Sequence, residues 1–504
     1  NPIIFLICYY NILAYILSLA RYFGNYSMAL KSKSAAFKEC FDKLAKKRVD
    51  YRKRRTYYWT DIAKYIDYFI HDDQSVLEIG AGAGELLNQV KGRRKLGIDF
   101  SEGMVTAARE QFPDIQFEVM DAEALEIEEK FDVIILSNLI GYITDIQSLF
   151  DQLRKISHPK TKIMVTYYNY LWEPLIKMAE FIGLKFKTPA QNWLSQVDIN
   201  NLLYLGGFDV YRTTKRMLIP INIPIVSHVM NRYVAKFPFF RLFALNTFSF
   251  AMPLPVSGDE EIDEKYSVSI VVPAMNESGN IEDAILRTPQ FGRWVELIFI
   301  EGGSKDGTWE KIQEIAEKYK DSHRIKIGQQ PGKGKGDAVR MGFDMAEGDI
   351  LMILDADLTV PPEDLPKFYY ALSSGKGEFI NGSRLVYTME KLAMRFLNVL
   401  GNKFFSSLFT WLLDQPFKDT LCGTKVLLRT DYEIIKRNRV YFGDFDPFGD
   451  YDLIFGAHEL NLKITELPIR YQERTYGTTN ISRFKHGLLL LRMCLFAARK
   501  IKFR

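Results

Sequence analysis

The second half of the chain repeats a rhythm of short apolar runs and helical patterns that few folds can accommodate. The apolar runs cover residues 267–274, 295–300 and 350–354, and helical patterns begin near residues 280 and 332. Strands that alternate with helices form a parallel sheet, and ligands of such sheets bind beyond the carboxyl ends of the strands. The rhythm therefore predicts a doubly wound α/β domain. The acids that follow the runs, and that we expect at one edge of the sheet, are Glu277, Glu301, Asp355 and Asp357.

Asp355 and Asp357 follow an apolar run directly and stand two residues apart. Two carboxylates this close repel each other unless a cation lies between them. Mg²⁺ and Mn²⁺ prefer oxygen ligands and substrate phosphates. We therefore expect both aspartates to bind a divalent metal. The alternative is a solvated turn before the helix that Pro361 and Pro362 begin.

The glycine-rich stretch 331–336 brings Lys333 and Lys335 to the start of a helical pattern. Lysines, free helix N–H groups and a metal ion together stabilise a departing nucleoside diphosphate. The second half is thus expected to bind a nucleotide-linked substrate.

The first half is organised around a glycine loop. An apolar run at 75–79 is followed by Gly80, Gly82 and Gly84, and a helical pattern begins at residue 85. Glycines at this spacing let the backbone approach a ligand. An acid at the end of the next strand can accept both hydroxyls of a ribose. The polar residues before the loop and after the next three apolar runs are Glu78, Asp99, Asp121 and Ser137.

The pattern VLEIGAGAG, LGIDFSEGMV, MDAEAL and FDVIILSN, within residues 57–215, resembles the class I S-adenosylmethionine-dependent methyltransferases. The resemblance implies a seven-stranded Rossmann-like domain that binds S-adenosylmethionine. It places Asp99 on the ribose hydroxyls, Phe100 beside the adenine and Asp121 on the adenine amine. Methyl transfer from a sulfonium needs mainly positioning, because the donor is already activated. The cofactor-binding residues that it implies are Glu78, Gly80, Gly82, Gly84, Asp99, Phe100, Asp121, Ala122 and Ser137.

The motifs VVPAMNES, IEGGSKDGT, PGKGKGDAVRMGF, LDADLTVPPEDL and INGSR resemble the family 2 glycosyltransferases of the GT-A fold, as do DTLCGTKVLLR, FGDYDLIFGA and RYQERTYGTTNISRFKHG. The resemblance covers about residues 266–490 and is nearest to the dolichol-phosphate mannosyltransferase branch. It implies a UDP- or GDP-linked sugar donor, inversion at the anomeric carbon, and Mg²⁺ or Mn²⁺ on Asp355 and Asp357. The nucleotide-sugar-binding residues that it implies are Pro273, Ala274, Glu277, Glu301, Asp306, Lys333, Lys335, Asp355 and Arg384.

The chain departs from that family at two positions. Glu301 and Gly302 stand where the family usually has two acids, so the nucleobase stays open between uracil and guanine. Thr359 stands where the dolichol-phosphate branch has a metal-binding glutamine, so one metal ligand is expected to be weaker.

Inverting transfer onto a hydroxyl needs a general base opposite the leaving group. Asp450 is our first candidate and Asp452 the second, while the alternative is that these acids cap helices or pair with arginine. An acceptor that is a lipid phosphate is already anionic and needs no base. The cationic residues expected to hold such a phosphate are Arg470, Arg474, Arg483 and Lys485.

The expected divisions are an apolar N-terminal segment (1–27), a basic helical lead-in (28–56), a methyltransferase domain (57–217), an apolar and proline-containing connector (218–265), a glycosyltransferase domain (266–490) and a basic C-terminal tail (491–504). Residues 3–20 have the length of one bilayer crossing, and a mistaken or upstream extension is the alternative. The lead-in either contacts anionic lipid or is the solvated face of a helix. Three alternative roles remain for the apolar connector: a hydrophobic lid, an interdomain packing surface and a patch that touches a membrane.

Net charge is only +4 on 504 residues, which gives no reason to expect nucleic acid as a partner. The four cysteines are scattered, so zinc sites and disulfide frameworks are not expected, and a reducing cytosol fits. We predict a bifunctional cytoplasmic enzyme, peripheral on the membrane, that combines methyl transfer with glycosyl transfer to a glycan or a polyprenyl-phosphate acceptor. The alternative is that one half is a catalytically silent binding module that recruits the other.

Overall fold

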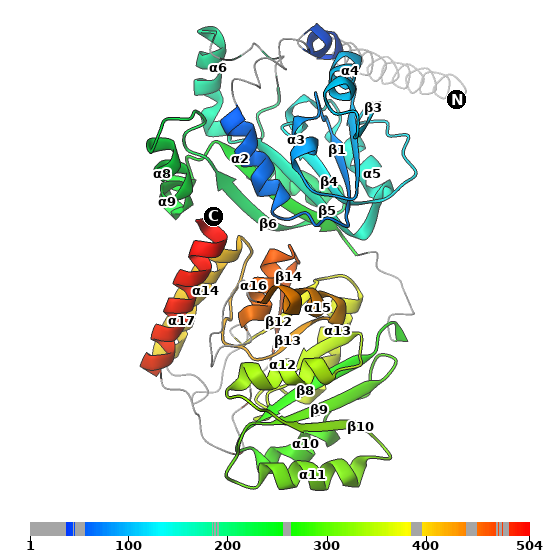
Figure 1. The fold of residues 1–504 in the computed structure, drawn as a ribbon, viewed down its shortest axis with the longest axis vertical. Helices are drawn as coiled ribbons and strands as arrows, with labels where there is room; N and C mark the ends of the chain where they lie inside the picture. Colours follow the sequence, from blue (N-terminus) through cyan, green and yellow to red (C-terminus); the bar gives the residue numbers. More distant parts are fainter. Residues whose placement is uncertain are drawn as a thin grey trace, which may run out of the picture. The chain divides into compact units, whose positions relative to one another are not determined.

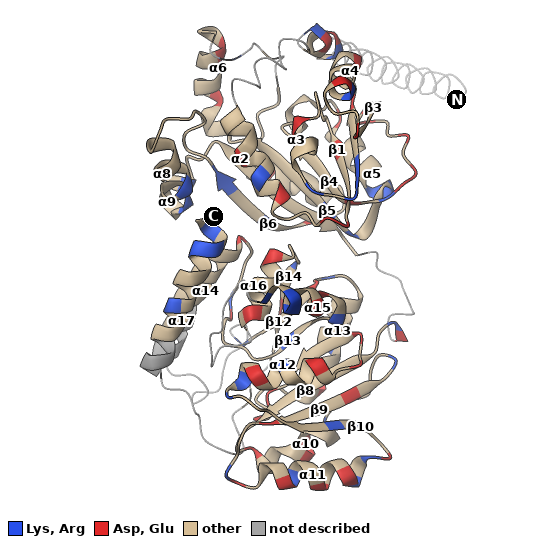
Figure 2. Ribbon diagram, viewed as in Figure 1, with Lys and Arg blue, Asp and Glu red and all other residues tan. Residues whose placement is uncertain are grey.

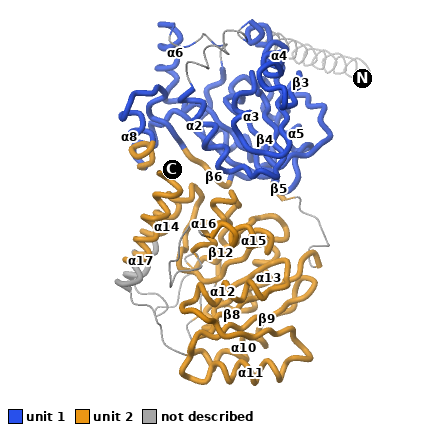
Figure 3. Tube along the Cα trace, viewed as in Figure 1, with its two compact units in different colours: residues 1–210, 215–231, 238–253 blue, residues 211–214, 232–237, 254–504 orange. Residues whose placement is uncertain are grey.

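The structure is a computed structural model that describes residues 37–43, 45, 56–183, 185, 188, 191–255, 264–384, 396–439, 451–469, 472, 476 and 483–503. The chain forms two compact units. The first contains residues 1–210, 215–231 and 238–253, and the second contains residues 211–214, 232–237 and 254–504 (Figure 3). Each unit holds a seven-stranded sheet, so the prediction of two doubly wound α/β domains is confirmed (Figure 1).

The first sheet has the strand order β3-β2-β1-β4-β5-β7-β6. Strands β1 to β5 run parallel, and β7 pairs antiparallel with β5. The strands are β1 Ser75–Ile79, β2 Arg94–Asp99, β3 Gln116–Val119, β4 Phe131–Ser137, β5 Ser157–Tyr168, β6 Phe208–Arg216 and β7 Asn246–Pro253. The helices are α2 Thr56–Asp67, α3 Glu85–Gln89, α4 Glu102–Gln111, α5 Ile146–Lys155, α6 Glu173–Phe181, α7 Gln196–Leu205, α8 Val226–Arg232 and α9 Pro238–Arg241.

Strand β7 lies inside the segment that we expected to be a connector, residues 218–265. Seven of its eight residues are buried. Aromatic rings of α2 pack on the strand, and the ring centroids of Tyr65 and Phe248 are 4.9 Å apart. The apolar character of this segment therefore serves the core of the first sheet, and the first unit extends to Pro253.

The second sheet has the order β10-β9-β8-β11-β13-β12-β14, with β13 antiparallel to both of its neighbours. The strands are β8 Val268–Ala274, β9 Val295–Glu301, β10 Arg324–Gln329, β11 Ile350–Ile353, β12 Phe379–Ser383, β13 Lys425–Leu428 and β14 Ile464–Pro468. The helices are α10 Ile281–Leu286, α11 Thr308–Tyr319, α12 Lys335–Met345, α13 Leu365–Ser373, α14 Phe396–Leu413, α15 Arg429–Asn438, α16 Tyr451–Glu459 and α17 Arg483–Ala497.

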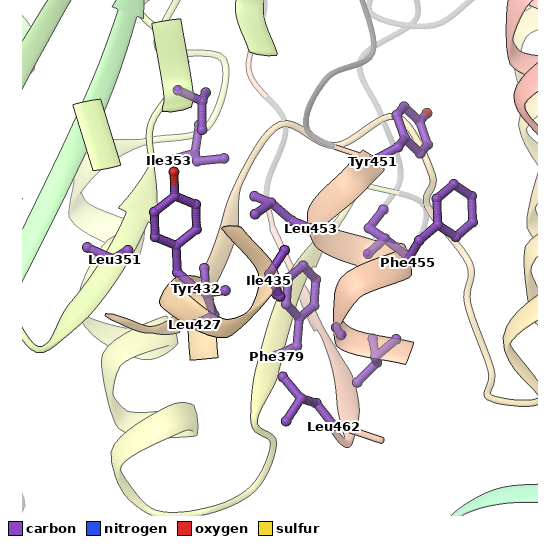
Figure 4. Packing of buried hydrophobic residues seen from close by; sticks show 14 of the residues in the cluster. Leu351, Ile353, Phe379, Leu427, Tyr432, Ile435, Tyr451, Leu453, Phe455 and Leu462 are labelled. Carbon is purple, nitrogen blue, oxygen red and sulfur yellow. The ribbon is translucent and has the colours of Figure 1, made fainter. Parts of the chain in front are cut away.

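Strand β11 is buried on both faces, as its unbroken apolar sequence predicts. Successive side chains of a strand point to opposite faces. Leu351 and Ile353 accordingly join the core that also contains Phe379 and Leu427 (Figure 4), whereas Ile350, Met352 and Leu354 join the core on the other face. Gly342 of α12 lets this helix approach the sheet closely, because a Cβ there would lie 2.4 Å from Val271.

Each sheet contains the same serine–aspartate arrangement at the amino ends of two central strands, and we call this arrangement a clasp. In the first sheet, Asp132 Oδ2 accepts from the backbone N and the hydroxyl of Ser75, at 2.8 and 2.7 Å. In the second, Asp349 Oδ2 accepts from the same two groups of Ser267, at 3.0 and 2.7 Å. Each clasp joins neighbouring parallel strands, β1 to β4 and β8 to β11.

The segment expected to be a basic tail, residues 491–504, is mostly the end of α17 followed by a short π-helical turn, Ala498–Lys502. Met493, Cys494 and Ala497 are spaced three and four residues apart and lie in the core, which fixes this end of the chain. Lys and Arg gather toward the C-terminal end of the chain (Figure 2), and Lys502 pairs with Asp414 at 2.5 Å.

Within the described part of the chain, every helix is either too short or too polar to cross a bilayer. The apolar segment at residues 3–20 lies outside the described residues.

Candidate functional site

The glycine loop of the first unit leads from the carboxyl end of β1 into α3 and lies against the carboxyl end of β2. Gly80, Gly82 and Gly84 have φ of 74°, 57° and 80°, values that favour glycine. The backbone N of Gly80 donates to the carbonyl of Ile98 at 2.8 Å, and that of Gly82 donates to Asp99 Oδ2 at 2.8 Å. The sequence pattern is thus realised as a tight loop held against the end of β2.

Asp99 is buried and its carboxylate is oriented before any ligand arrives. Besides the bond from Gly82, Asp99 Oδ1 accepts from the backbone N of Ser101 at 2.9 Å. A carboxylate offers about four lone-pair directions, so it can accept from several donors at once. The carboxylate therefore fits the ribose of an adenosyl group.

The other predicted cofactor residues lie along the same edge, because Ile79 pairs in register with Ile98 and with Leu136. Ser137 ends β4, and its hydroxyl is 3.4 Å from that of Thr166. Asp121 is exposed, and its Oδ1 accepts from the backbone N of Glu123 at 2.9 Å. Ala122 is buried beside it, and Glu78 is buried within β1.

A short helical segment at residues 37–43 packs over Phe100, which sequence reasoning missed. Phe41 contacts Phe100 and Tyr142, with ring centroids at 5.8 and 5.3 Å. Asp42 accepts from the hydroxyl of Ser101 at 2.5 Å and from the backbone N of Gly103 at 3.1 Å. The spacing of Phe37, Phe41 and Ala45, four residues apart, is the signal that could have revealed this buried face.

Tyr58, at the start of α2, adds a polar cluster beyond β4 and β5. Its hydroxyl donates to Asn246 Oδ1 at 2.9 Å and accepts from Asn138 Nδ2 at 3.5 Å, and its ring stacks on Tyr168 at 6.3 Å. Burial raises the pKa of Tyr58 well above its ordinary value, so its phenol stays protonated. Sequence reasoning assigned no role to Tyr58, Asn138 and Asn246.

In the second unit, Lys335 and Asp355 meet at the same sheet edge. Lys335 Nζ lies 2.5 Å from Asp355 Oδ1. Gly423 packs against both, because a Cβ there would lie 2.0 Å from Asp355 Oδ2 and 2.4 Å from Lys335 Nζ. Gly423 belongs to a motif that we recognised but to which we assigned no role. Lys333 lies two residues before Lys335 and is exposed.

Asp357 lies on a tight turn just beyond β11. Leu358 donates its backbone N to the carbonyl of Asp355 at 3.0 Å and has φ of 50°, a conformation that leucine rarely adopts and that is frequent at functional sites. Asp357 Oδ1 accepts from the hydroxyl of Thr359 at 2.8 Å. The two carboxylates are hard donors, but no cluster of three or more His, Cys, Asp or Glu suited to a metal occurs among the described residues. A divalent ion held here would take its other ligands from substrate phosphates and water.

Glu277 and Glu301 are buried on adjoining loops of this edge. Glu277 Oε2 accepts from Asn280 Nδ2 at 2.8 Å, and Glu301 Oε2 accepts from Gln329 Nε2 at 3.2 Å. Burial raises the pKa of Glu301, but hydrogen bonds, chiefly from Ser304, outweigh it and hold the pKa below its ordinary value. Pro273 and Ala274 end β8, in register with Ile300 and Glu301 respectively.

Asp306 joins this cluster and links it to a residue far along the chain. It accepts from the hydroxyl of Thr308 at 2.5 Å and from the backbone N of Ser278 at 3.2 Å. Tyr476 donates to Asp306 at 3.4 Å and lies 3.0 Å from the Ser278 hydroxyl. Burial raises the pKa of Asp306, but hydrogen bonds from Thr308 and Ser278 outweigh burial and hold the pKa below its ordinary value. The carboxylate therefore stays charged. Tyr476 was part of a recognised motif and had no predicted role.

Arg384, expected to contact phosphate, forms a bidentate ion pair with Asp419. The Nε–Oδ2 and Nη2–Oδ1 distances are 2.7 and 2.8 Å, and Asp419 is buried. Glu466 accepts from the backbone N of Asp419 at 2.9 Å, and burial raises its pKa. Arg384 therefore orders the loop that leads to Gly423, and a phosphate would share its guanidinium with Asp419.

Asp452, the second candidate base, begins α16 and accepts from Arg439 Nε at 3.0 Å. An arginine partner stabilises the charged carboxylate and weakens it as a proton acceptor. Asp450, Arg470 and Arg474 lie outside the described residues, and so do the side chains of Arg483 and Lys485, whose backbones belong to α17.

Two family models match separate parts of the chain. The "Methyltransferase domain" model matches residues 70–209, and the "Glycosyl transferase family 2" model matches residues 269–432. The first match runs from before β1 to the start of β6, and the second runs from β8 to the first turn of α15.

The chain is also similar to named transferases of other organisms. The chain is 38% identical over 122 residues to a dolichol-phosphate mannosyltransferase of Pyrococcus furiosus, which covers 24% of this chain and 33% of that protein. It is 29% identical over 224 residues to glycosyltransferase AglJ of Haloferax volcanii, covering 44% and 68%. An undecaprenyl-phosphate 4-deoxy-4-formamido-L-arabinose transferase of Proteus mirabilis is 34% identical over 112 residues, covering 21% and 34%. The chain spans about a third of the length of the first and third of these relatives.

Among solved structures, the chain is similar to a chain of the complex between the Haloferax volcanii Trm112 methyltransferase activator and a putative methyltransferase. The identity is 16%, the TM-score is 0.35, and the match covers 44% of this chain and 99% of the other. The two family models fall on the two sheets in order, so the chain carries a methyltransferase domain followed by a family 2 glycosyltransferase domain.

Proposed function

We propose that the second unit transfers a sugar, with inversion, from a nucleotide sugar to a polyprenyl-phosphate acceptor. The observation that carries this proposal is the juxtaposition of Lys335, Asp355 and Gly423 one turn from Asp357. Lys335 stands at the start of α12, so an ammonium group and free helix N–H groups are presented together to a diphosphate. Bound Mg²⁺ or Mn²⁺, held by Asp357 and Asp355, would neutralise charge on the leaving diphosphate.

The buried carboxylates define the nucleoside side of this site. Glu301 and Asp306 stay charged because of their hydrogen bonds, and they accept hydrogen bonds from a nucleobase or ribose. Glu277 and the strand end at Pro273 and Ala274 enclose the same side. Tyr476, bonded to Asp306, covers it.

A lipid phosphate is the acceptor that this site favours over a neutral hydroxyl. Asp452 is engaged by Arg439, which leaves it a poor general base. A phosphate acceptor is anionic already and needs no proton acceptor, and α17 carries Arg483 and Lys485 toward its start. The dolichol-phosphate and undecaprenyl-phosphate enzymes among the relatives support this choice. Asp450 as a general base for a glycan hydroxyl is the competing proposal.

We propose that the first unit binds S-adenosylmethionine at the edge formed by the Gly80–Gly84 loop, Asp99 and Ser137. Asp99 holds the ribose, Phe100 and Asp121 flank the adenine, and Phe41 covers Phe100. The cofactor would supply an activated methyl group, and the residues around it need only position the acceptor. Ser137, Tyr58 and Asn138 face the end of β4, where an acceptor would enter.

Both units would then work at the cytoplasmic face of a membrane, where a polyprenyl phosphate is presented. In the competing proposal one unit binds its ligand without catalysis and recruits the other. Donor hydrolysis by the purified chain across a panel of UDP- and GDP-sugars with Mn²⁺, together with the rise in Tm produced by each donor and by S-adenosylmethionine, tests both. No hydrolysis and no rise in Tm with any nucleotide sugar would refute the glycosyltransferase proposal, whereas a rise without turnover would favour the binding module.

A further inference from the structure

The first unit carries an extended exposed apolar surface outside the predicted sites. We define the apolar face as the exposed large apolar side chains of residues 170–182, 221–229 and 239–243. Apolar side chains exposed singly are ordinary, but contiguous sets mark protein or membrane contacts. The most exposed are Phe181 (84%), Ile225 (80%), Phe239 (66%), Ile182 (57%), Met178 (55%) and Leu242 (53%).

Hydrogen bonds join two of the three segments of this face. Trp172 Nε1 donates to the carbonyl of Phe243 at 2.8 Å. Asn169 Nδ2 donates to the carbonyls of Leu242 and Ala244, each at 2.9 Å. Figure 1 shows α6, α8 and α9 along one side of the first unit. These bonds hold residues 169–172 against residues 242–244, and Figure 1 shows α8 beside α9, so the three segments lie on one side of the unit.

Buried polar side chains satisfy the backbone beneath the apolar face. Asn231 Oδ1 accepts from the backbone N of Leu218 and of Ile219 at 2.7 and 2.9 Å, and its Nδ2 donates to the carbonyl of Ile219 at 2.7 Å. The hydroxyl of Ser227, fully buried, donates to the carbonyl of Ile221 at 2.7 Å. A surface that enters an apolar medium must satisfy its backbone internally, and these bonds do so.

Charge around the apolar face is one-sided. No Asp or Glu occurs between Asp209 and Asp259. Of the six Lys or Arg in this interval, Arg212 and Lys236 are buried and Arg216 pairs with Asp61, whereas Arg232 is exposed and Lys215 and Arg241 are partly exposed. Figure 2 shows basic and no acidic residues on α8 and α9. The two glutamates of α6 are each paired with a lysine, Glu173 with Lys177 and Glu180 with Lys185. An apolar surface with an excess of cations at its border matches the headgroups and acyl chains of an anionic lipid surface.

We propose that the apolar face docks on an anionic lipid surface and lies within the headgroup layer. The helices of the face, α6, α8 and α9, have nine, seven and four residues, far short of a bilayer crossing. This inference deepens the proposed location at a membrane and assigns it to particular residues of the methyltransferase unit.

Co-sedimentation of the full chain with vesicles tests the assignment. The probes are vesicles of phosphatidylcholine alone and vesicles that also contain phosphatidylglycerol. The test variant is Ile225→Ser with Phe239→Ser, and the matched control is Val119→Ser with Leu286→Ser, which also removes two exposed apolar side chains, from β3 and from α10. All four side chains are exposed, so the fold should tolerate each change.

The wild-type chain and the control should bind the phosphatidylglycerol vesicles more strongly than phosphatidylcholine vesicles. The test variant should partition at least about tenfold more weakly, since each substitution removes a buried apolar side chain from the lipid contact. If the test variant binds vesicles as strongly as the wild-type chain, the apolar face is not the lipid-binding surface, although the proposed membrane location stands. No wild-type binding to either vesicle would overturn both. A dimer in solution that the test variant alone dissociates, with vesicle binding unchanged, would assign the face to a second copy of the chain. Donor hydrolysis should stay at the wild-type level in every variant, so a failure of the proposed chemistry is seen separately.

Discussion

Lys335 Nζ lies 2.5 Å from Asp355 Oδ1, and Gly423 leaves no room for a further atom beside the pair. The contact fixes a flexible lysine at the start of α12, so its charge is in place before a diphosphate arrives. Because Gly423 comes from the loop before β13, the site depends on the loop that Arg384 and Asp419 order.

Gly423→Ala should therefore impair sugar-donor turnover. The added methyl would displace Asp355 or Lys335, and misplacing a binding group by about 1 Å can cost on the order of 10²-fold in rate. We expect kcat/KM for donor hydrolysis to fall by about that factor. Gly401→Ala is the matched control, because a Cβ at Gly401 meets nothing within 4 Å. Equal losses in both variants would argue against a role for the Gly423 contact.

Asp357→Ala should abolish metal-dependent glycosyl transfer, with a loss on the order of 10²–10³-fold. The aspartate is proposed as the main protein ligand of the divalent ion. Thr359→Val is the comparison, since it removes only the hydroxyl that donates to Asp357 at 2.8 Å and should have a much smaller effect. Turnover as a function of Mn²⁺ concentration distinguishes the two. The Tm rise with S-adenosylmethionine should be unchanged in both, and retained Mn²⁺-dependent turnover in Asp357→Ala would reject the site.

Asp99→Asn should remove the Tm rise that S-adenosylmethionine produces. The amide would turn a donor toward the backbone N of Gly82 or Ser101, which costs about 1–3 kcal/mol for the unmade bond, and it would lose an acceptor for the ribose. Asp114→Asn, at an exposed position of the same unit, is the control. Any Tm rise with a nucleotide sugar should survive in Asp99→Asn. An unchanged response to S-adenosylmethionine would place the cofactor elsewhere.

Phe41→Ala should weaken S-adenosylmethionine binding by roughly three- to tenfold, because aromatic pairs such as Phe41 with Phe100 contribute about 0.5–1.5 kcal/mol. Isothermal titration would measure the Kd directly. Lys43→Ala, on the exposed side of the same segment, should leave it unchanged. Equal Kd values for the two variants would mean that the segment covers Phe100 without supporting the cofactor.

The two clasps should make each unit sensitive to acid. Burial raises the pKa of Asp132 and of Asp349, but their hydrogen bonds outweigh burial and hold each pKa below the ordinary value of 3.8. A carboxyl whose pKa is lower in the folded chain stabilises the fold above its unfolded pKa, and this contribution is lost as pH falls through the folded pKa.

Calorimetry as a function of pH should therefore show Tm falling as the pH drops below about 4. Asp132→Asn should lower Tm at neutral pH and flatten the acid dependence of the first unit, and Asp349→Asn should do the same for the second. Asp151→Asn, at an exposed position, should have neither effect. An acid dependence that both clasp variants retain in full would assign it to other carboxylates.

Much of this architecture can be predicted from the sequence, because apolar runs and glycine spacings are local signals. The run 350–354 reads as a doubly buried strand and is one, and the glycines after residue 79 form the tight loop that their spacing predicts. Strand β7 was missed because its partner, β5, is about 80 residues earlier, and nothing local distinguishes it from an apolar connector. The contacts of Tyr476 with Asp306 and of Arg384 with Asp419 were missed for the same reason, since separations of 170 and 35 residues leave no periodic trace.

The Ser75–Asp132 and Ser267–Asp349 clasps grip the rim of each sheet that faces away from the glycine loops and carboxylates. These clasps are thus remote from the two proposed sites. A half whose site loops changed until its proposed activity was lost would still fold and still present its surface, so evolution could remove one activity and keep the protein that carried it.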